Sequence, residues 1–285
     1  MTFSLILYKY TLNWVGSMEN IKKETKIGRY KISYYQKGRG KVLLLLHSLL
    51  NTAYSFRHVY GPLSEKYKVI MPDLLGCGYS TKPDDFDFTL KSYAEHLNQL
   101  LEKLKVKKLS IGGVSGSGAI ALKFVTMFPE MVEKLVLIDA LGMEAGRSGS
   151  ARGLPVRGNV NDKDMVLRLY LSQFSDPSVV SADEREKIAE LAVSENVPGC
   201  THKILQANGD FSVAGIENIK VPTLIIWGEK DPVLPKIMAE NFANKIPNSQ
   251  YVMIPEAGHL PHEESPEDFN TVLLDFLKGN LPKSG

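Results

Sequence analysis

The segment LSIGGVSGSGAIAL, residues 109–122, places a serine in a setting that suits nucleophilic chemistry. A buried-strand pattern precedes Ser115, and a helix-like run of small and apolar residues follows it. The small residues Gly113, Gly116 and Gly118 surround the serine. Small neighbours allow the sharp, strained strand-to-helix turn that exposes a serine hydroxyl at the edge of a sheet. We therefore predict that Ser115 is the nucleophile of an acyl-transfer reaction.

Ser117 is a rival nucleophile, because it also lies between two glycines. It stands where the nucleophile pattern G-x-S-x-G ends in glycine, so we expect it to strain the turn further. The predicted strand ends in register with Ser115, which favours Ser115. These glycines are also typical of a phosphate-binding loop, but such a loop needs Lys followed by Ser or Thr, and here Ala119 and Ile120 follow Gly118.

A serine hydroxyl needs a general base within hydrogen-bond reach and an acid that orients that base. Among the six histidines, His259 follows the last predicted strand at a turn on the edge where Ser115 is expected. We predict His259 as the base. Its neighbour His262 is expected at the surface or the rim of the site.

The other histidines have less suitable positions. His47 ends a predicted strand and is a candidate for lining the pocket. His58 and His96 lie in predicted amphipathic helices, and His202 lies in a polar middle region, so we expect these three to face solvent.

The best candidate for the acid is Asp231, in the segment WGEKDP just beyond the predicted strand PTLIIW. The order Ser, Asp, His along the chain suits a site at the carboxyl edge of a parallel sheet. Asp139, which ends another predicted strand, is the alternative acid, and otherwise a strand-end cap. Asp231 could also be a simple turn residue before Pro232.

The elements that must position these residues alternate along the chain. Short apolar runs of strand type are separated by segments with helical spacing, which predicts right-handed crossovers and a mostly parallel sheet. The predicted strands are residues 26–36, 41–47, 67–72, 108–113, 134–139, 222–227 and 250–254, and the helices are 53–66, 89–104, 117–128 and a C-terminal helix through 269–277. Gly38 and Gly40 are expected to close an opening hairpin.

The alternation stops between residues 141 and 219, where polar amphipathic helices are expected and Ser181 with Glu184 forms a candidate capping box. We divide the chain into an extension (1–25), an α/β core (26–140 and 220–285) and a helical insertion (141–219). In the apolar extension Lys9 interrupts a run too short for a membrane span. We interpret it as a frayed end or as the product of a start upstream of Met18.

The composition of the chain argues against several classes of function. The 285 residues carry a formal net charge of +2, with basic residues scattered along the chain, so no nucleic-acid partner is expected. Two cysteines, Cys77 and Cys200, are too few for a disulfide framework and lack metal-ligand spacing. We expect a cytoplasmic monomer or homodimer with a small-molecule substrate, no membrane partner and no metal.

The motifs LLLLHSLL, IMPDLLGCGYS, GGVSGSG, VPTLIIWGEKDPVLP and EAGHLPHEESPEDFN together resemble the α/β-hydrolase fold superfamily over about residues 26–280. The resemblance implies an eight-stranded, mostly parallel sheet, a helical cap after the sixth strand and no cofactor. It assigns Ser115, Asp231 and His259 to a catalytic triad. It also implies an oxyanion hole formed by the backbone N–H groups of Gly116 and Leu49.

The sequence departs from the family at Ser48, which follows His47 where the family has glycine. If that position needs a positive φ, serine is costly there, and otherwise its hydroxyl adds a polar group for binding substrate. We expect a serine hydrolase that cleaves a small carboxylic ester. Hydrolysis of a carbon-carbon bond in a vinylogous diketone, a small-molecule receptor with little turnover, and a lyase are the alternatives.

Overall fold

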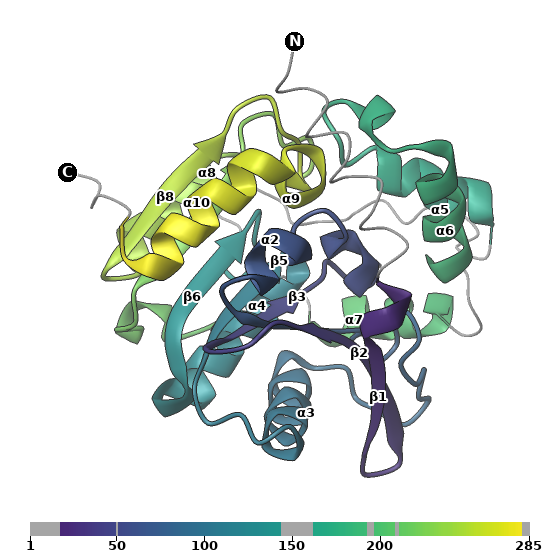
Figure 1. Cartoon of the computed structure of the whole chain (residues 1–285), viewed down its shortest axis with the longest axis horizontal. Helices are drawn as coiled ribbons and strands as arrows, with labels where there is room; N and C mark the ends of the chain where they lie inside the picture. The colour runs from purple at the N-terminus through teal and green to yellow at the C-terminus, as the bar shows by residue number, and fades with distance from the viewer. Residues whose placement is uncertain (1–17, 50, 144–161, 193–196, 209–210, 281–285) are drawn as a thin grey trace.

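The computed structural model describes residues 18–49, 51–143, 162–192, 197–208 and 211–280 (Figure 1). Eight strands in this part of the chain form one sheet, in the order β1-β2-β4-β3-β5-β6-β7-β8. Every neighbouring pair from β4 to β8 is parallel, which confirms the predicted mostly parallel sheet. The strands are β1 (Lys22–Ile27), β2 (Tyr30–Lys37), β3 (Val42–Leu46), β4 (Lys68–Pro72), β5 (Leu109–Val114), β6 (Val132–Ile138), β7 (Thr223–Gly228) and β8 (Ser249–Ile254).

The N-terminal hairpin differs from the prediction. The stretch 26–36 was expected to be one strand, but the chain reverses within it, between β1 and β2. Gly28 makes this possible because it adopts a φ of +56°, which glycine tolerates better than other residues. The first strand, β1, begins at Lys22, four residues before the predicted start of the core at residue 26.

Helices cover both faces of the sheet (Figure 1). Successive residues of β3 point to opposite faces, so Leu44 packs in one buried cluster and Leu43 in the other. Burial on both faces explains why such strands are continuous apolar runs. The first cluster includes residues of α3, α4 and α8, and the second includes residues of α2 and α10. The bounds are α2 (Tyr60–Ser64), α3 (Leu90–Lys103), α4 (Gly116–Met127), α8 (Ile237–Lys245), α9 (Pro261–Glu264) and α10 (Pro266–Lys278).

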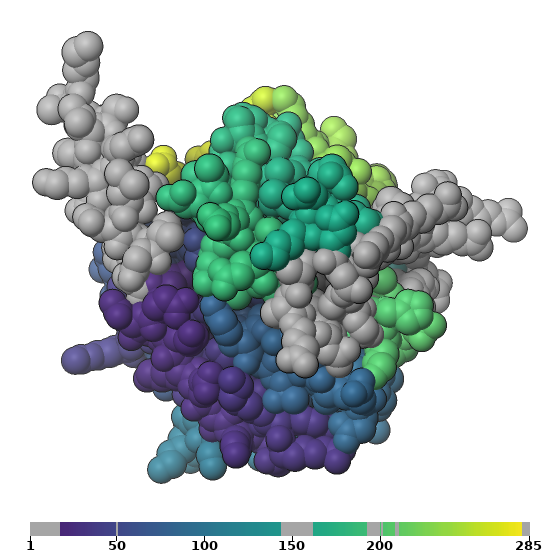
Figure 2. All heavy atoms as spheres, turned by 90° about the vertical axis from the view of Figure 1, so that its right-hand side faces the viewer, coloured from purple at the N-terminus to yellow at the C-terminus, as the bar shows by residue number. Residues whose placement is uncertain are grey.

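Between β6 and β7 the chain forms α5 (Lys163–Leu171), α6 (Ala182–Ala192) and α7 (Val197–Asn208). Figure 2 shows this region in teal and green on one face of the molecule, above the purple N-terminal strands. The predicted capping box is confirmed, because Glu184 N–H donates to Ser181 Oγ at 3.4 Å and Ser181 N–H donates to Glu184 Oε2 at 2.9 Å. Parts of the predicted insertion and of the N-terminal extension, residues 144–161 and 1–17, lie outside the described residues.

A buried charge cluster joins the insertion to the core. Arg57, 1% exposed, donates to Glu184 of α6 at 2.6 Å and to Glu263 of α9 at 2.5 Å. The hydroxyl of Tyr170 in α5 also donates to Glu263, and His58 lies 2.9 Å from Glu184. Each buried charge therefore has a partner of opposite sign, as burial requires. Within the described ranges, no helix is both long and apolar enough to cross a membrane.

Candidate functional site

Ser115 lies at the sharp turn between β5 and α4. Its backbone angles are φ 53° and ψ −124°, in a region that non-glycine residues rarely adopt. Hydrogen bonds hold this conformation: Ser115 N–H donates to the Ile138 carbonyl, and the Ser115 carbonyl accepts from Gly118 N–H, each at 2.9 Å. A Cβ at Gly113 would lie 2.2 Å from the Ser117 carbonyl oxygen, so this close approach requires glycine.

The structure brings Ser115, His259 and Asp231 together. His259 Nε2 lies 2.9 Å from Ser115 Oγ, and His259 Nδ1 lies 2.8 Å from Asp231 Oδ2. A carboxylate can only accept, so Nδ1 carries the proton and Nε2 is left to accept from the serine hydroxyl. His259 is 1% exposed, which keeps this relay away from bulk water.

The loop after β7 fixes Asp231. Its Oδ1 accepts the N–H groups of Val233 and Leu234 at 2.7 and 3.0 Å, which leaves Oδ2 for His259. This loop touches the His259 loop so closely that a Cβ at Gly228 would lie 1.9 Å from the Gly258 carbonyl oxygen.

The segment that follows α5 holds the His259 loop from the other side. His259 N–H donates to the Gln173 carbonyl at 2.8 Å. Glu264 links the two segments, because it accepts Gly258 N–H at 2.7 Å together with the N–H groups of Ser175 and Asp176 at 3.2 and 2.6 Å. The insertion therefore contributes to the position of the predicted base.

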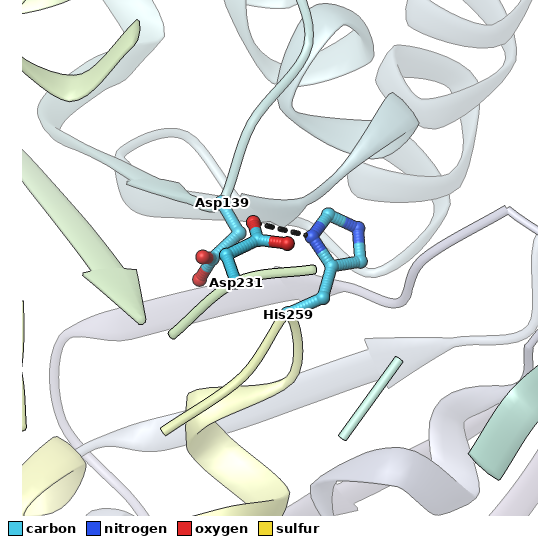
Figure 3. A group of neighbouring side chains, drawn as sticks. All are labelled: Asp139, Asp231 and His259. Atoms are coloured by element: carbon cyan, nitrogen blue, oxygen red, sulfur yellow. Dashed lines mark hydrogen bonds and ion pairs between the residues drawn. The ribbon is translucent and has the colours of Figure 1, made fainter. Parts of the chain in front are cut away.

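Asp139, the alternative acid, lies next to this relay but is not the partner of His259. Its Oδ1 accepts Gly228 N–H at 2.9 Å, and Figure 3 shows it on the far side of Asp231 from His259. Ligand atoms of Asp139, Asp231 and His259 lie within 4.8 Å of one another, a spacing that could hold a metal ion. Both ring nitrogens of His259 are already hydrogen-bonded, so the geometry favours proton transfer.

The loop after β3 is built on a buried histidine. Leu74 N–H donates to His47 Nε2 at 3.0 Å, and His47 Nδ1 donates to the Ser48 carbonyl at 2.8 Å. Burial lowers the pKa of His47 to about 4, so the ring is neutral near pH 7. His47 is thus a fully buried scaffold residue and does not line a pocket.

Two serines replace family glycines, and both have local partners. Ser48 has no positive φ, so glycine is not required there, and its hydroxyl donates to the Leu49 carbonyl at 3.1 Å. Ser117 lies inside α4 and also has no positive φ. The prediction that Ser117 strains the turn further is therefore wrong. Its hydroxyl donates to the His47 carbonyl at 2.5 Å. A Cβ at Gly116 would lie 2.3 Å from Leu49 Cδ1, so the two residues predicted to form the oxyanion hole are in close contact.

Three histidines are more buried than predicted. His58, expected in solvent, has a side chain that is only 17% exposed and lies 2.9 Å from Glu184. His262, expected at the surface, is fully buried in α9 with its Nε2 3.2 Å from Ser55 Oγ, and burial lowers its pKa to about 3. His96, expected in solvent, is 8% exposed and packs near the rings of Tyr30 and Phe86. His202 is exposed as expected.

Sequence reasoning also missed the residues that brace the site. Arg57 and Glu263 are 206 positions apart, and Gln173 belongs to the insertion. No local pattern marks such contacts. The one available signal for these contacts was the acidic pair Glu263 and Glu264, in the segment HEES after His259. Carboxylates at the start of a helix are favourably placed near unpaired backbone N–H groups.

The comparisons with known proteins identify the fold family. A family model described as the alpha/beta hydrolase fold matches residues 41–155 and 170–266. Lipase 3 of Moraxella sp. is 29% identical over 239 residues, which cover 80% of this chain and 75% of the lipase.

Two solved structures extend the comparison. A serine hydrolase involved in carbazole degradation is 26% identical, with a TM-score of 0.80 over 90% of this chain and 98% of that one. A membrane phospholipase A shares the fold at 24% identity, with a TM-score of 0.83 over 97% of this chain and 94% of that chain.

Proposed function

The chain belongs to the α/β-hydrolase fold family, and we propose that it cleaves small carboxylic esters through an acyl-enzyme on Ser115. The observation that carries this proposal is the continuous relay from Ser115 Oγ through the His259 ring to the Asp231 carboxylate, at 2.9 and 2.8 Å. The similarity to a lipase supports ester cleavage.

In the first half-reaction Ser115 Oγ attacks the ester carbonyl carbon while its proton passes to His259 Nε2. Asp231 stabilises the imidazolium that forms and keeps the ring oriented. The tetrahedral intermediate then collapses: the bond to the alkoxide oxygen breaks, and that oxygen takes the proton from Nε2. The alcohol leaves, and the acyl group remains on Ser115.

In the second half-reaction a water molecule gives a proton to His259 Nε2 and its oxygen attacks the acyl carbon. Collapse of this intermediate breaks the bond to Ser115 Oγ, which regains the proton, and a carboxylic acid is released. In both halves the backbone N–H groups of Leu49 and Gly116 would stabilise the oxyanion, a contribution of about 3 kcal/mol for one such donor. Gly116 and the Leu49 side chain lie next to each other, and this role requires the two residues to be neighbours.

We further propose that residues 141–219 act as a cap that selects the substrate. The hydrogen bond from His259 N–H to the Gln173 carbonyl supports this, because it brings the insertion to the site. Tyr170 and Phe174 are both buried with their ring centroids 5.2 Å apart, so they belong to the interior that the insertion forms with the core.

The second candidate function is hydrolysis of a carbon-carbon bond in a vinylogous diketone. The observation that supports this second candidate function is the similarity, at 26% identity, to a serine hydrolase involved in carbazole degradation. In that reaction the leaving group would be a carbanion, which has to be protonated before or during departure. Esters and diketones of matched size, supplied at equal concentration, separate the two functions by their kcat/KM.

The first experiment treats the folded protein with a fluorophosphonate, measures the intact mass and maps the labelled peptide. One adduct on Ser115 that is lost in His259→Ala, but kept in the exposed control His202→Ala, would support a base-activated nucleophile. An adduct on Ser117 would overturn the assignment. Absence of labelling would overturn the acyl-enzyme and favour a receptor or a lyase, and repeated turnover of p-nitrophenyl esters would separate an enzyme from a receptor that reacts once.

A further inference from the structure

Asp139, directly after β6, has a strained backbone and a fully enclosed side chain. It adopts a φ of 41°, which costs free energy for a non-glycine residue, and its side chain is 0% exposed. Its backbone N–H donates to the Ile226 carbonyl at 3.0 Å, which fixes it against β7. Strain of this kind persists only where the surrounding structure fixes the backbone, and strained residues cluster at active sites.

The two oxygens of this carboxyl group differ. Oδ1 accepts Gly228 N–H at 2.9 Å, whereas Oδ2 is buried and accepts no hydrogen bond from any described residue. Ligand atoms of Asp139, Asp231 and His259 lie within 4.8 Å of one another. Two carboxylates this close, out of contact with water, cannot both be ionised at low cost, so one of them must carry a proton.

The hydrogen bonds indicate which carboxyl group carries it. Asp231 accepts two backbone N–H groups and His259 Nδ1, and each of these donors stabilises a carboxylate. Asp139 accepts one backbone N–H. Burial, the neighbouring Asp231 and the charge of Glu264 all raise the pKa of Asp139 well above the usual range of an aspartate. These contacts favour Asp139 as the group that carries the proton.

We propose that Asp139 is a neutral carboxylic acid whose Oδ2–H donates to the Asp231 carboxylate, so that Asp139 is a positioning residue for the relay. The inference rests on the proposed function, because it assigns Asp139 a role behind the triad acid. A donor on this side holds the Asp231 carboxylate in place against His259 Nδ1 and shares part of its negative charge. It also provides the otherwise unpartnered Oδ2 with a partner.

Two substitutions of similar size test the role of the donor. In Asp139→Asn the amide oxygen can accept Gly228 N–H while the NH₂ group donates to Asp231, so kcat/KM for an ester should stay within about threefold. In Asp139→Leu no donor remains, and we expect kcat to fall by about 10- to 100-fold, the usual effect of losing a hydrogen bond to a charged group, with little change in KM. Equal losses in both variants would overturn the proposal.

The pH profile tests the charge. A neutral Asp139 means that Asp139→Asn removes no charge near His259, so the acid limb of kcat/KM should stay where it is in the unmodified protein. If Asp139 were ionised, the substitution would remove an anion that favours the imidazolium. The acid limb would then move to lower pH, which would contradict the proposal. Among the described residues, the charged and titratable groups around Asp139 and His259 include Asp231, Glu264 and His262.

Infrared difference spectroscopy gives a test that needs no turnover. The unmodified protein near pH 7 should show the carbonyl band of a protonated carboxylic acid, and this band should be absent from the spectrum of Asp139→Asn but present in that of the exposed-site control Asp268→Asn. Absence of the band from the unmodified protein would overturn the proposal. If the band is present but fluorophosphonate does not label Ser115, the proposed function fails while the protonation state stands.

Discussion

The hydroxyl of Ser117 donates to the backbone carbonyl of His47, so it joins the first turn of α4 to the loop that carries Leu49. Glycine, which the family pattern places here, cannot make this bond. The serine that departs from the pattern is therefore a brace between the two segments predicted to supply the oxyanion donors. Four predictions follow from this brace and from three other contacts.

Removing the brace should weaken the predicted oxyanion hole. In Ser117→Ala the buried His47 carbonyl loses its donor, so we expect kcat/KM to fall about fivefold, the effect of about 1 kcal/mol for a neutral hydrogen bond. Ser117→Gly should lose at least as much. Steady-state kinetics on an ester, with affinity for a boronic acid that mimics the tetrahedral intermediate, measures the effect.

The matched control for Ser117 is Thr126→Ala in the same helix, whose hydroxyl donates to the nearby Lys123 carbonyl. This control should leave both quantities unchanged. If Ser117→Gly were as active as the unmodified protein, the brace would have no role in the reaction.

Asp231→Asn should impair the relay without unfolding the protein. The amide cannot accept from His259 Nδ1 with its NH₂ group, and it favours the wrong tautomer of the ring. By analogy with other triads we expect kcat to fall by about 10³- to 10⁴-fold. The rate of fluorophosphonate labelling should fall with it, whereas Asp268→Asn on the exposed face of α10 should label normally. A loss below tenfold would indicate that Asp139 or another acid orients His259 instead.

Acid pH should destabilise the fold through its buried histidines. Burial lowers the pKa of His96 from 6.5 to about 4. Between pH 6.5 and 4 the histidine therefore binds a proton in the unfolded state but not in the folded state. The free energy of unfolding therefore decreases as pH falls from 6.5 toward 4, by about 1.4 kcal/mol per pH unit for one such group.

The substitution His96→Phe tests this sign, because the site already lies among Tyr30 and Phe86. Urea unfolding at several pH values should give a shallower decrease for His96→Phe than for the unmodified protein. The exposed substitution His202→Gln should leave the slope as it is. If the pH dependence of the free energy of unfolding were the same in His96→Phe and in the unmodified protein, His96 would bind a proton as readily in the folded state as in the unfolded state.

Removing Arg57 alone should destabilise the protein more than replacing all three charged residues Arg57, Glu184 and Glu263. Arg57→Met leaves Glu184 and Glu263 buried without their cation, and we expect a loss of about 3–5 kcal/mol in the free energy of unfolding. Urea unfolding measures this loss, and Arg168→Met on the exposed side of α5 is the control. The triple variant Arg57→Met, Glu184→Gln, Glu263→Gln should recover part of the stability, because it removes the unpaired charges. A triple variant less stable than Arg57→Met would contradict this account.

Local patterns in the sequence predicted the sheet and the three candidate residues of the relay. The strands around Leu43 and Ile225 are buried on both faces, so they are continuous apolar runs that pattern analysis finds easily. Ser115 and Asp231 follow such strands, β5 and β7, and His259 follows the edge strand β8. Parallel strands end at one edge of a sheet, so their proximity could be inferred from topology alone.

Other features depend on contacts between distant parts of the chain. The burial of His96 depends on the β1–β2 hairpin that contributes Tyr30, and the role of Arg57 depends on Glu184, 127 positions away. A helical period cannot show that a neighbouring element covers the face on which a histidine lies. The reversal at Gly28 was missed because alternation continues on both sides of the turn.

The hydrogen bonds that dock residues 173–176 onto the His259 loop link two properties of an enzyme that are often separate. His259 donates its N–H to Gln173, and Glu264 binds both segments at once. Displacing residues 173–176 would remove the hydrogen bond that His259 N–H donates to the Gln173 carbonyl. In the proposed mechanism, substrate entry past this segment and the support of the base would therefore depend on the same hydrogen bond.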